Sequence, residues 1–396
     1  SSPKKGYLLI KTLYTLVSSG TEKTLVDFGK ANFIDKATQQ PDKVKDVLNK
    51  IKNDGLNSTY EAIISKLDKP IPLGYCNVGI VEELGEGVDE FKVGDLVVSN
   101  GSHAEFVTVP KNLCALLPNS VLPKYGTFVP LASIGLQGLR LLKPELGETI
   151  LVSGLGLIGQ LTCQLLKNSG CNVLGIDIDD ERCKLARSYG VEVFNLSEGS
   201  NPINWCMQKT KNIGVDGVII TAATNSSEPI HQAAESCRKR GRIIMVGVTG
   251  MNIRRDLFYK KELSFQVSCS YGPGRYDEKY EQEGNDYPIG FVRWTEKRNF
   301  EAVINLISQN KIDLEKLISH IFDFKNASKA YDLLSSPTNN LGILLSYENL
   351  DHKINKEINL ENSTEKIIHR ENTGIGLIGA GEYANRILLS AFDKAG

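Results

Sequence analysis

A glycine-rich turn near the middle of the sequence carries the clearest chemical signal. It reads Gly154-Leu155-Gly156-Leu157-Ile158-Gly159 and directly follows a predicted buried strand. In such a turn the first glycine allows a tight bend, the second lets the backbone approach a pyrophosphate, and the third lets helix and strand pack closely. Free N–H groups at the start of the next helix then hold the phosphates. The pattern predicts a nicotinamide dinucleotide site, and hydride transfer as the reaction.

A carboxylate follows at the end of the next predicted strand. Asp177 lies 23 residues after Gly154, where an acid accepts the hydroxyls of the adenosine ribose and repels a 2′-phosphate. The sequence therefore favours NAD over NADP, although Arg182 would weaken this preference by lying over the adenine ribose. Two later loops, Thr221-Ala222 and Gly247-Val248, follow strands and are expected near the nicotinamide. The alternative is that these loops are simple turns.

The apolar residues around these motifs follow two different sequence patterns. Short apolar runs separated by Gly and Pro predict a β-barrel over residues 1–125, which residues 269–348 complete. Helical spacing of Val44, Val47, Leu48 and Ile51 predicts a helical insertion in that barrel at about 30–69. Alternating strand-like and helix-like segments over 126–268 predict a doubly wound parallel sheet of the Rossmann type. The expected fold class is therefore α/β.

A second motif of the same kind closes the chain. It reads Gly379-Ala380-Gly381-Glu382-Tyr383-Ala384 and stands close to the last residue, Gly396. Residues 349–371 are polar, contain no Gly or Pro, and are expected to be a linker. Residues 372–396 are predicted to be the opening strand and helix of a second, truncated Rossmann domain. The rest of that oxidoreductase domain would be a missing partner in cis.

Several segments together resemble the medium-chain dehydrogenase/reductase superfamily. They are Pro72-Leu73-Gly74-Tyr75, residues 91–97 (FKVGDLV) and residues 241–247 (GRIIMVG). The resemblance covers residues 6 to about 348 and implies a GroES-like barrel joined to a Rossmann domain. Residues 18–22 (SSGTE) resemble the branch that includes bacteriochlorophyllide dehydrogenases.

A narrower resemblance, to bi-domain oxidoreductases, rests on the helical insert through Lys69-Pro70, residues 270–277, residues 286–299 and the C-terminal tail. Those proteins are fused to a module of the glucose–fructose oxidoreductase and inositol dehydrogenase type. The resemblance implies a sugar or nucleotide-sugar substrate and a place in surface-polysaccharide synthesis.

The zinc ligands of that superfamily are not found at the matching positions. Ser19 and Tyr75 stand where the resemblance expects Cys and His, and residues 129–133 (VPLAS) offer no ligand side chain. We therefore expect a protein without zinc. Tyr75 would donate a proton to the substrate oxygen, with Ser19 as a relay, and Glu22 and His103 would act as acid–base groups. The alternative is that Tyr75 and His103 are packing residues.

A loop rich in Gly and aromatic residues is the candidate substrate site. It contains Tyr271, Arg275 and Tyr276. Arginine binds phosphate or carboxylate with two parallel hydrogen bonds, which suggests recognition of a substrate anion. A structural ion pair at Arg275 is the alternative.

Composition limits the remaining classes of function. The net charge is −1, which argues against nucleic acid and anionic membranes as partners. The eight scattered cysteines indicate a reduced, cytoplasmic protein, and a homodimer through the strand near 264–269 is left open. Two other activities also stay open. One is zinc-free reduction of a C=C bond, as in quinone or enoyl reductases, and the other is a non-catalytic scaffold for the second module.

Overall fold

The computed structural model describes residues 3–18, 20, 22–23, 26, 72–199, 201–334, 340–347, 377–379, 381 and 383–395. The predicted helical insertion at 30–69, the predicted linker at 349–371 and Ser19 lie outside the described residues. The chain divides into two units, Ser1–Asp351 and His352–Gly396. Within the second unit the described residues form a π-helical turn, Ala384–Leu388, followed by α15 (Leu389–Ala395).

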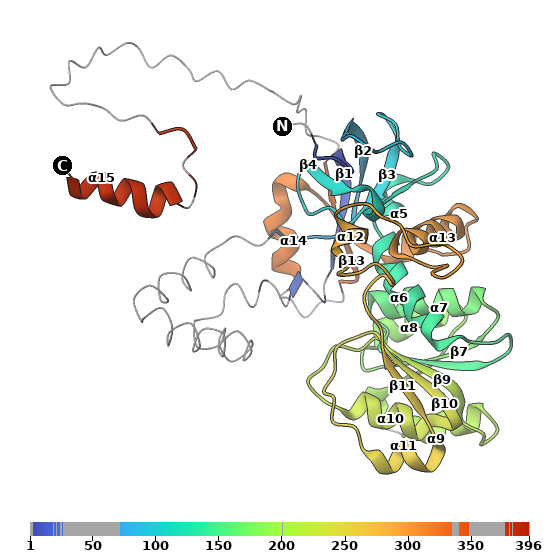
Figure 1. Cartoon of the computed structure of the whole chain (residues 1–396). Helices are drawn as coiled ribbons and strands as arrows, with labels where there is room; N and C mark the ends of the chain where they lie inside the picture. The colour runs from blue at the N-terminus through green and yellow to red at the C-terminus, as the bar shows by residue number, and fades with distance from the viewer. Residues whose placement is uncertain are drawn as a thin grey trace, which may run out of the picture. The chain divides into compact units, whose positions relative to one another are not determined.

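The first unit contains a seven-stranded sheet built around one long strand (Figure 1). β1 (Tyr7–Ser18) pairs with one strand along most of one edge, and on its other edge with a second strand along its first half and a third along its second half. Its last residue, Ser18, therefore lies opposite Gly342. The other strands are β2 (Asn77–Leu84), β3 (Leu96–Ser99), β4 (Phe106–Pro110), β5 (Cys114–Leu116), β12 (Ile318–Asp323) and β13 (Gly342–Ser346).

A six-stranded parallel sheet forms the other half of this unit, in the order β11-β10-β9-β6-β7-β8. The chain runs outward from β6 to β8 and then returns to β9 on the other side of β6. Ligands bind at such a reversal, outside the carboxyl ends of the strands. The strands are β6 (Thr149–Ser153), β7 (Asn172–Asp177), β8 (Glu192–Asn195), β9 (Val215–Ile220), β10 (Cys237–Met245) and β11 (Ser264–Val267).

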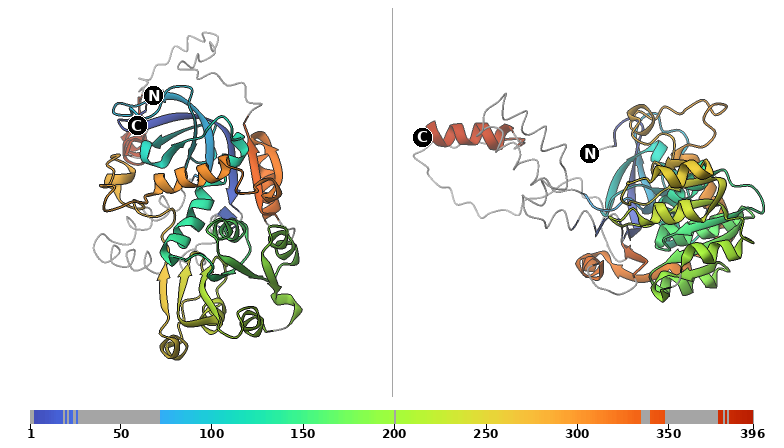
Figure 2. Two further views of the ribbon diagram at one scale, coloured as in Figure 1. Left: turned by 90° about the vertical axis from the view of Figure 1, so that its right-hand side faces the viewer. Right: turned by 90° about the horizontal axis from the view of Figure 1, so that it is seen from below.

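Helices cover both faces of the parallel sheet, as the two views of Figure 2 show. They are α6 (Val129–Leu142), α7 (Leu157–Asn168), α8 (Asp180–Ser188), α9 (Pro202–Lys209), α10 (Glu228–Ser236) and α11 (Arg255–Lys261). We call the part with the seven-stranded sheet the barrel half and the part with the parallel sheet the Rossmann half. The other described α-helices of this unit belong to the barrel half and are α5 (Pro123–Gly126), α12 (Glu278–Glu281), α13 (Glu296–Ser308) and α14 (Ala327–Leu334).

One hydrophobic core joins the two sheets. Leu16 and Val78 of the barrel belong to the same buried cluster as Leu136 of α6 and Leu161 of α7. Burial of this apolar surface stabilises the junction and fixes the end of β1 relative to the parallel sheet.

The predicted fold class is confirmed. None of the described helices is both long and apolar enough to cross a membrane.

Candidate active site

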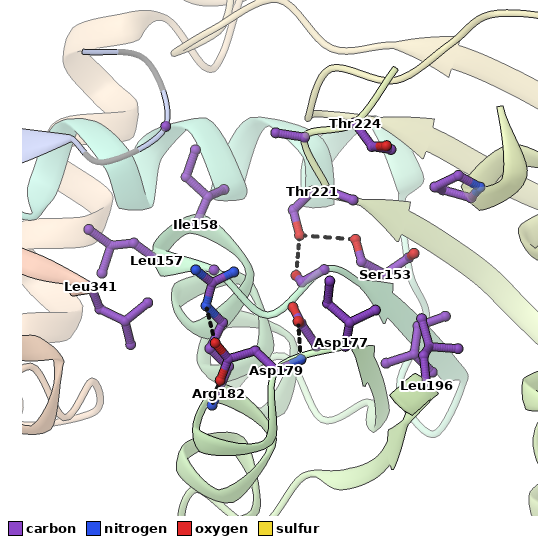
Figure 3. A pocket seen from close by; sticks show the side chains of 18 of the residues that line it. Ser153, Leu157, Ile158, Asp177, Asp179, Arg182, Leu196, Thr221, Thr224 and Leu341 are labelled. Carbon is purple, nitrogen blue, oxygen red and sulfur yellow. Dashed lines mark hydrogen bonds and ion pairs between the residues drawn. The ribbon is translucent and has the colours of Figure 1, made fainter. Parts of the chain in front are cut away.

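A cavity of about 650 Å³ lies at the carboxyl ends of β6, β7 and β9. Figure 3 shows its lining side chains. The Rossmann half contributes Gly154, Gly156, Leu157, Ile158, Asp177, Arg182, Thr221 and Ala222, all of them predicted cofactor residues. The barrel half contributes Ser18, Gly20, Lys23, Leu333, Asn340 and Leu341. The cavity is therefore bounded by both halves of this unit.

The three motif glycines have three different physical roles. Gly154 has φ of +96°, a left-handed value that favours glycine, and a Cβ there would lie 2.7 Å from the backbone nitrogen of Ala222. A Cβ on Gly159 would lie 2.0 Å from the oxygen of Gly154, so this glycine lets α7 pack against β6. A Cβ on Gly156 meets no protein atom within 4 Å. The space beside Gly156 is the space that a pyrophosphate would fill.

The amino end of α7 faces this open space. Gly156 is its N-cap residue, no side chain caps the helix, and its first turn contains no acidic residue. The unpaired N–H groups and the positive end of the helix dipole are therefore available to an anion.

The carboxylate of Asp177 supports the turn and borders the cavity. Its Oδ2 accepts from the backbone N–H of Leu155 at 2.5 Å, and its Oδ1 accepts from that of Asp179 at 2.9 Å. The Arg182 guanidinium lies 3.8 Å from Asp179 (Figure 3). Because each carboxylate oxygen has more than one lone pair, Asp177 can still accept from a ribose hydroxyl.

The two later loops pack against the glycine-rich turn. The hydroxyl of Thr221 donates to the oxygen of Gly154 at 2.5 Å. Gly247 lies behind Ala222, because a Cβ on Gly247 would come within 2.2 Å of the Ala222 oxygen. Val248 donates its backbone N–H to the same oxygen at 3.0 Å. Thr221 and Ala222 thus border the cavity, whereas Gly247 and Val248 support the loop from behind.

Ser18 is a residue of the cavity that sequence reasoning missed. The phenol of Tyr75 donates to the Ser18 hydroxyl at 3.0 Å, so Tyr75 stands directly behind it. Lys23 borders the cavity on the same side. The position of Ser18 next to the predicted Ser19 was the available signal, but only the folded chain, in which β13 pairs with the end of β1, shows that this residue borders the cavity.

The predicted residues Glu22 and His103 form a buried cluster beside Ser18. Glu22 has no exposed surface and accepts from the backbone N–H of Ser18 at 2.8 Å. The hydroxyl of Tyr331 donates to the same carboxylate at 2.6 Å. Burial, followed by the charge of Glu22, raises the pKa of Tyr331 far above its usual value, so this hydroxyl remains a donor.

His103 completes this cluster through both of its ring nitrogens. Its Nε2 lies 3.0 Å from the carboxylate of Glu22, and its Nδ1 lies 2.6 Å from the Thr15 hydroxyl. The ring fits because residue 74 is a glycine with φ of +89°, and a Cβ there would lie 2.7 Å from the imidazole. The structure thus brings three of the four predicted acid–base residues, Tyr75, Glu22 and His103, around Ser18.

The predicted substrate loop is engaged in contacts of its own. The Arg275 guanidinium lies 2.6 Å from the carboxylate of Glu281 and 4.3 Å from the centre of the Tyr276 ring. Tyr271 is buried and packs edge-on against Phe300. The described lining of the cavity does not include these three predicted residues. Arg275 therefore forms the structural ion pair that was the alternative, and a role in substrate binding stays a prediction.

Comparison with known proteins places this arrangement in a family. An alcohol dehydrogenase GroES-like domain model matches residues 44–119, and a zinc-binding dehydrogenase model matches residues 158–283. The chain belongs to the medium-chain, zinc-type alcohol dehydrogenase family. It is accordingly a nucleotide-binding oxidoreductase of the CH–OH class.

Named relatives span most of the chain. A D-guloside 3-dehydrogenase of Escherichia coli (strain K12) is 27% identical over 65% of this chain and 72% of its own length. A D-xylulose reductase of Saccharomyces cerevisiae (strain ATCC 204508 / S288c) is 23% identical over 70% of this chain and 82% of its own. The crystal structure of galactitol-1-phosphate dehydrogenase from Escherichia coli superposes with a TM-score of 0.66 at 19% identity, over 87% of this chain and 95% of its own. This last likeness shows the fold.

Membership in a zinc-binding family corrects one expectation. We expected a protein without zinc because Ser19 and Tyr75 stand at the ligand positions of the resemblance, and that expectation was wrong. Two replaced ligands do not decide the matter, since zinc accepts several kinds of N, S and O donor. Within the described ranges, however, no three His, Cys, Asp or Glu side chains gather to hold a metal ion. His103 and Glu22 do lie in contact, but no third side chain of these kinds joins them among the described residues, so those residues alone do not complete a zinc site.

Proposed function

We propose that this alcohol dehydrogenase relative uses NAD(H) to interconvert a secondary hydroxyl and a ketone on a sugar or sugar derivative. The observation that carries the proposal is the composition of the cavity. One side of the cavity is the glycine-rich turn at 154–159, and the other side includes Ser18 and Lys23 from the barrel half. If the turn binds the pyrophosphate of NAD, the nicotinamide ring would lie between that pyrophosphate and these polar residues.

The preference for NAD over NADP rests on charge. Asp177 and Asp179 both border the cavity where the adenosine ribose would lie, and the cation next to them is Arg182. Two carboxylates against one guanidinium disfavour the dianionic 2′-phosphate of NADP. The ribose hydroxyls of NAD would instead find acceptors.

In the oxidative direction the carbon–hydrogen bond of the substrate breaks and the hydride moves to the nicotinamide ring. The hydroxyl proton leaves at the same end of the cavity: the Ser18 hydroxyl accepts it while it passes its own proton to solvent water, so Ser18 acts as a relay and the proton ends in water. Tyr75 donates to that oxygen at 3.0 Å and so orients its lone pairs. Glu22 holds the Ser18 backbone, which makes Glu22 and His103 positioning residues in this scheme.

A sugar substrate agrees with the names of two relatives, a D-guloside 3-dehydrogenase and a D-xylulose reductase. Lys23, a cation at the substrate end of the cavity, suits a ligand rich in hydroxyl groups or carrying an acid. A role in surface-polysaccharide synthesis, fusion to a second oxidoreductase module and pairing of two copies through β11 stay predictions.

Turnover tests the proposal. The purified chain is mixed with NAD and a panel of sugar alcohols and glycosides that includes xylitol, and NADH formation is followed. We expect turnover with at least one member, and a loss of about tenfold or more in kcat for Ser18→Ala with NADH affinity unchanged. The matched control, Ser169→Ala, lies at the far end of α7 and leaves kcat unchanged. NADH binding without turnover across the panel would contradict a dehydrogenase and favour the scaffold alternative.

A further inference from the structure

A second cavity, of about 730 Å³, lies at the opposite end of the parallel sheet. It is formed by the start of β10 and by α11, which Figure 1 shows at the bottom of the first unit. Because the strands are parallel and the cofactor cavity is at their carboxyl ends, this cavity opens at their amino ends. We call it the basic cavity.

The basic cavity is strongly positive, whereas the chain as a whole is nearly neutral. Five cations line it, and they face one acid, Glu262, which gives a local charge of about +4 in a chain whose net charge is −1. So many like charges in one concave surface repel each other unless an anion binds among them. The five cations are Lys239, Arg240, Arg255, Lys260 and Lys261.

Two of the five cations already have partners. Lys261 donates to the carbonyl oxygens of Ala234, Glu235 and Cys237 at 3.0, 2.6 and 2.7 Å, and so holds the end of α10. The exposed Arg240 lies 3.3 Å from Glu262. No ion pair is found for the other three, Lys239, Arg255 and Lys260, within the part of the chain that the structure describes. These three charges are available to a ligand.

An open aromatic ring lies among these cations. Tyr259 is 70% exposed, and the Arg255 guanidinium lies 4.5 Å from its centre. Arginine that stacks on an aromatic ring holds the ring in place and leaves its own edge free to bind oxygen atoms. The rest of the ring surface is open to a planar group. Aromatic rings next to cations of this kind bind the bases of nucleotides by stacking.

We propose that the basic cavity binds a nucleoside diphosphate. Lys239, Lys260 and Arg255 neutralise its phosphates, and Tyr259 stacks on its base. Glu262, the one acid of the lining, can accept from a ribose hydroxyl. A small ligand is favoured over a nucleic acid because the cations converge on one concave surface, whereas the chain as a whole carries no excess of positive charge.

The experiment is a calorimetric titration of the chain with UDP in the presence of saturating NADH. NADH fills the cofactor cavity, so that any remaining site is a different one. We expect one UDP site whose affinity falls as salt rises, with uridine too weak to detect. The double variant Lys239→Gln/Lys260→Gln should weaken UDP about tenfold or more while its affinity for NADH is unchanged. The control Lys325→Gln removes an exposed lysine of the barrel half and leaves UDP affinity intact.

A second variant separates stacking from charge. Tyr259→Ala should weaken UDP about fivefold or more, yet leave the binding of inorganic pyrophosphate unchanged. The proposal is overturned if the NADH-saturated protein binds no UDP, or if the double variant binds UDP as well as the parent chain does. Binding of duplex DNA in place of UDP also overturns it, and would assign the basic cavity to a polymer.

Discussion

The Nε2 atom of His103 lies 3.0 Å from the Oε2 atom of Glu22, and both side chains are almost fully buried. This contact ties the loop before β4 to the segment that follows β1. Because Glu22 also accepts from the backbone of Ser18, the buried pair fixes the hydroxyl that borders the cavity. The relationship links the packing of the barrel to the chemistry proposed for the site.

Removal of Glu22 should therefore cost both stability and activity. Glu22→Ala leaves three buried donors, on Ser18, His103 and Tyr331, without their acceptor, and we expect a loss of about 3 kcal/mol in the free energy of unfolding. Urea denaturation measures it. The control Glu278→Ala truncates an exposed glutamate of α12 and should change stability little. A Glu22→Ala variant as stable as the parent chain would show that the cluster does not hold this segment.

Two motif glycines should respond to alanine in opposite ways. Gly156→Ala adds a methyl group to open space, so the melting temperature stays unchanged while NADH affinity falls about tenfold or more. Gly159→Ala brings a methyl group against the oxygen of Gly154 and should destabilise the protein by about 1–3 kcal/mol. Thermal denaturation and NADH titration of the two variants separate the effects. Equal losses of stability would contradict these separate roles.

Cofactor choice should depend on Asp177. Asp177→Asn keeps an acceptor for the N–H of Leu155 but removes the charge, so the preference for NADH over NADPH should fall about tenfold. Asp180→Asn is the matched control, because Asp180 lies close by on α8 and pairs with Lys184 at the surface. The two dissociation constants are compared for each variant. An unchanged ratio in Asp177→Asn would mean that another group sets the choice.

Glu296 makes stability depend on pH. Burial, and then the charge of Glu281, raises the pKa of Glu296 to about 8 from an ordinary value of 4.5. As pH rises, Glu296 loses its proton in the unfolded chain before it does so in the folded protein. The stabilising contribution of the protonated side chain is therefore fully present below pH 4.5 and is lost as pH rises toward about 8. Glu296→Gln should remove this loss and stabilise the protein at pH 9 by roughly 2–4 kcal/mol.

Urea unfolding at pH 5 and at pH 9 measures the effect. Glu278→Gln removes an exposed carboxylate from the same part of the chain and serves as the control. The prediction is contradicted if the difference in unfolding free energy between Glu296→Gln and the parent chain is the same at pH 5 and at pH 9.

The cofactor half of the site could be predicted because its signals are local. The turn at 154–159 and the acid at 177 follow strands that are short, apolar and adjacent in the sequence. The barrel half could not be predicted in the same way. Tyr331 reaches Glu22 across 309 residues, and Ser18 borders the cavity only because β13 returns to pair with β1.

The partner of Arg275 was also beyond reach from the sequence. Arg275 and Glu281 are six residues apart and lie in irregular chain and a short helix. No periodic spacing marks such a pair, in contrast to pairs three or four residues apart on a helix. The prediction of an anion-binding arginine and the alternative of an ion pair could be separated only by the folded loop.

One titration tests the central claim most directly. Purified protein is titrated with NADH and with NADPH while nicotinamide fluorescence is followed. We predict saturable binding of NADH that is about tenfold or more tighter than that of NADPH, because Asp177 and Asp179 border the ribose end of the cavity. No saturable binding of NADH, or tighter binding of NADPH, would contradict an NAD-dependent dehydrogenase built on the turn at 154–159.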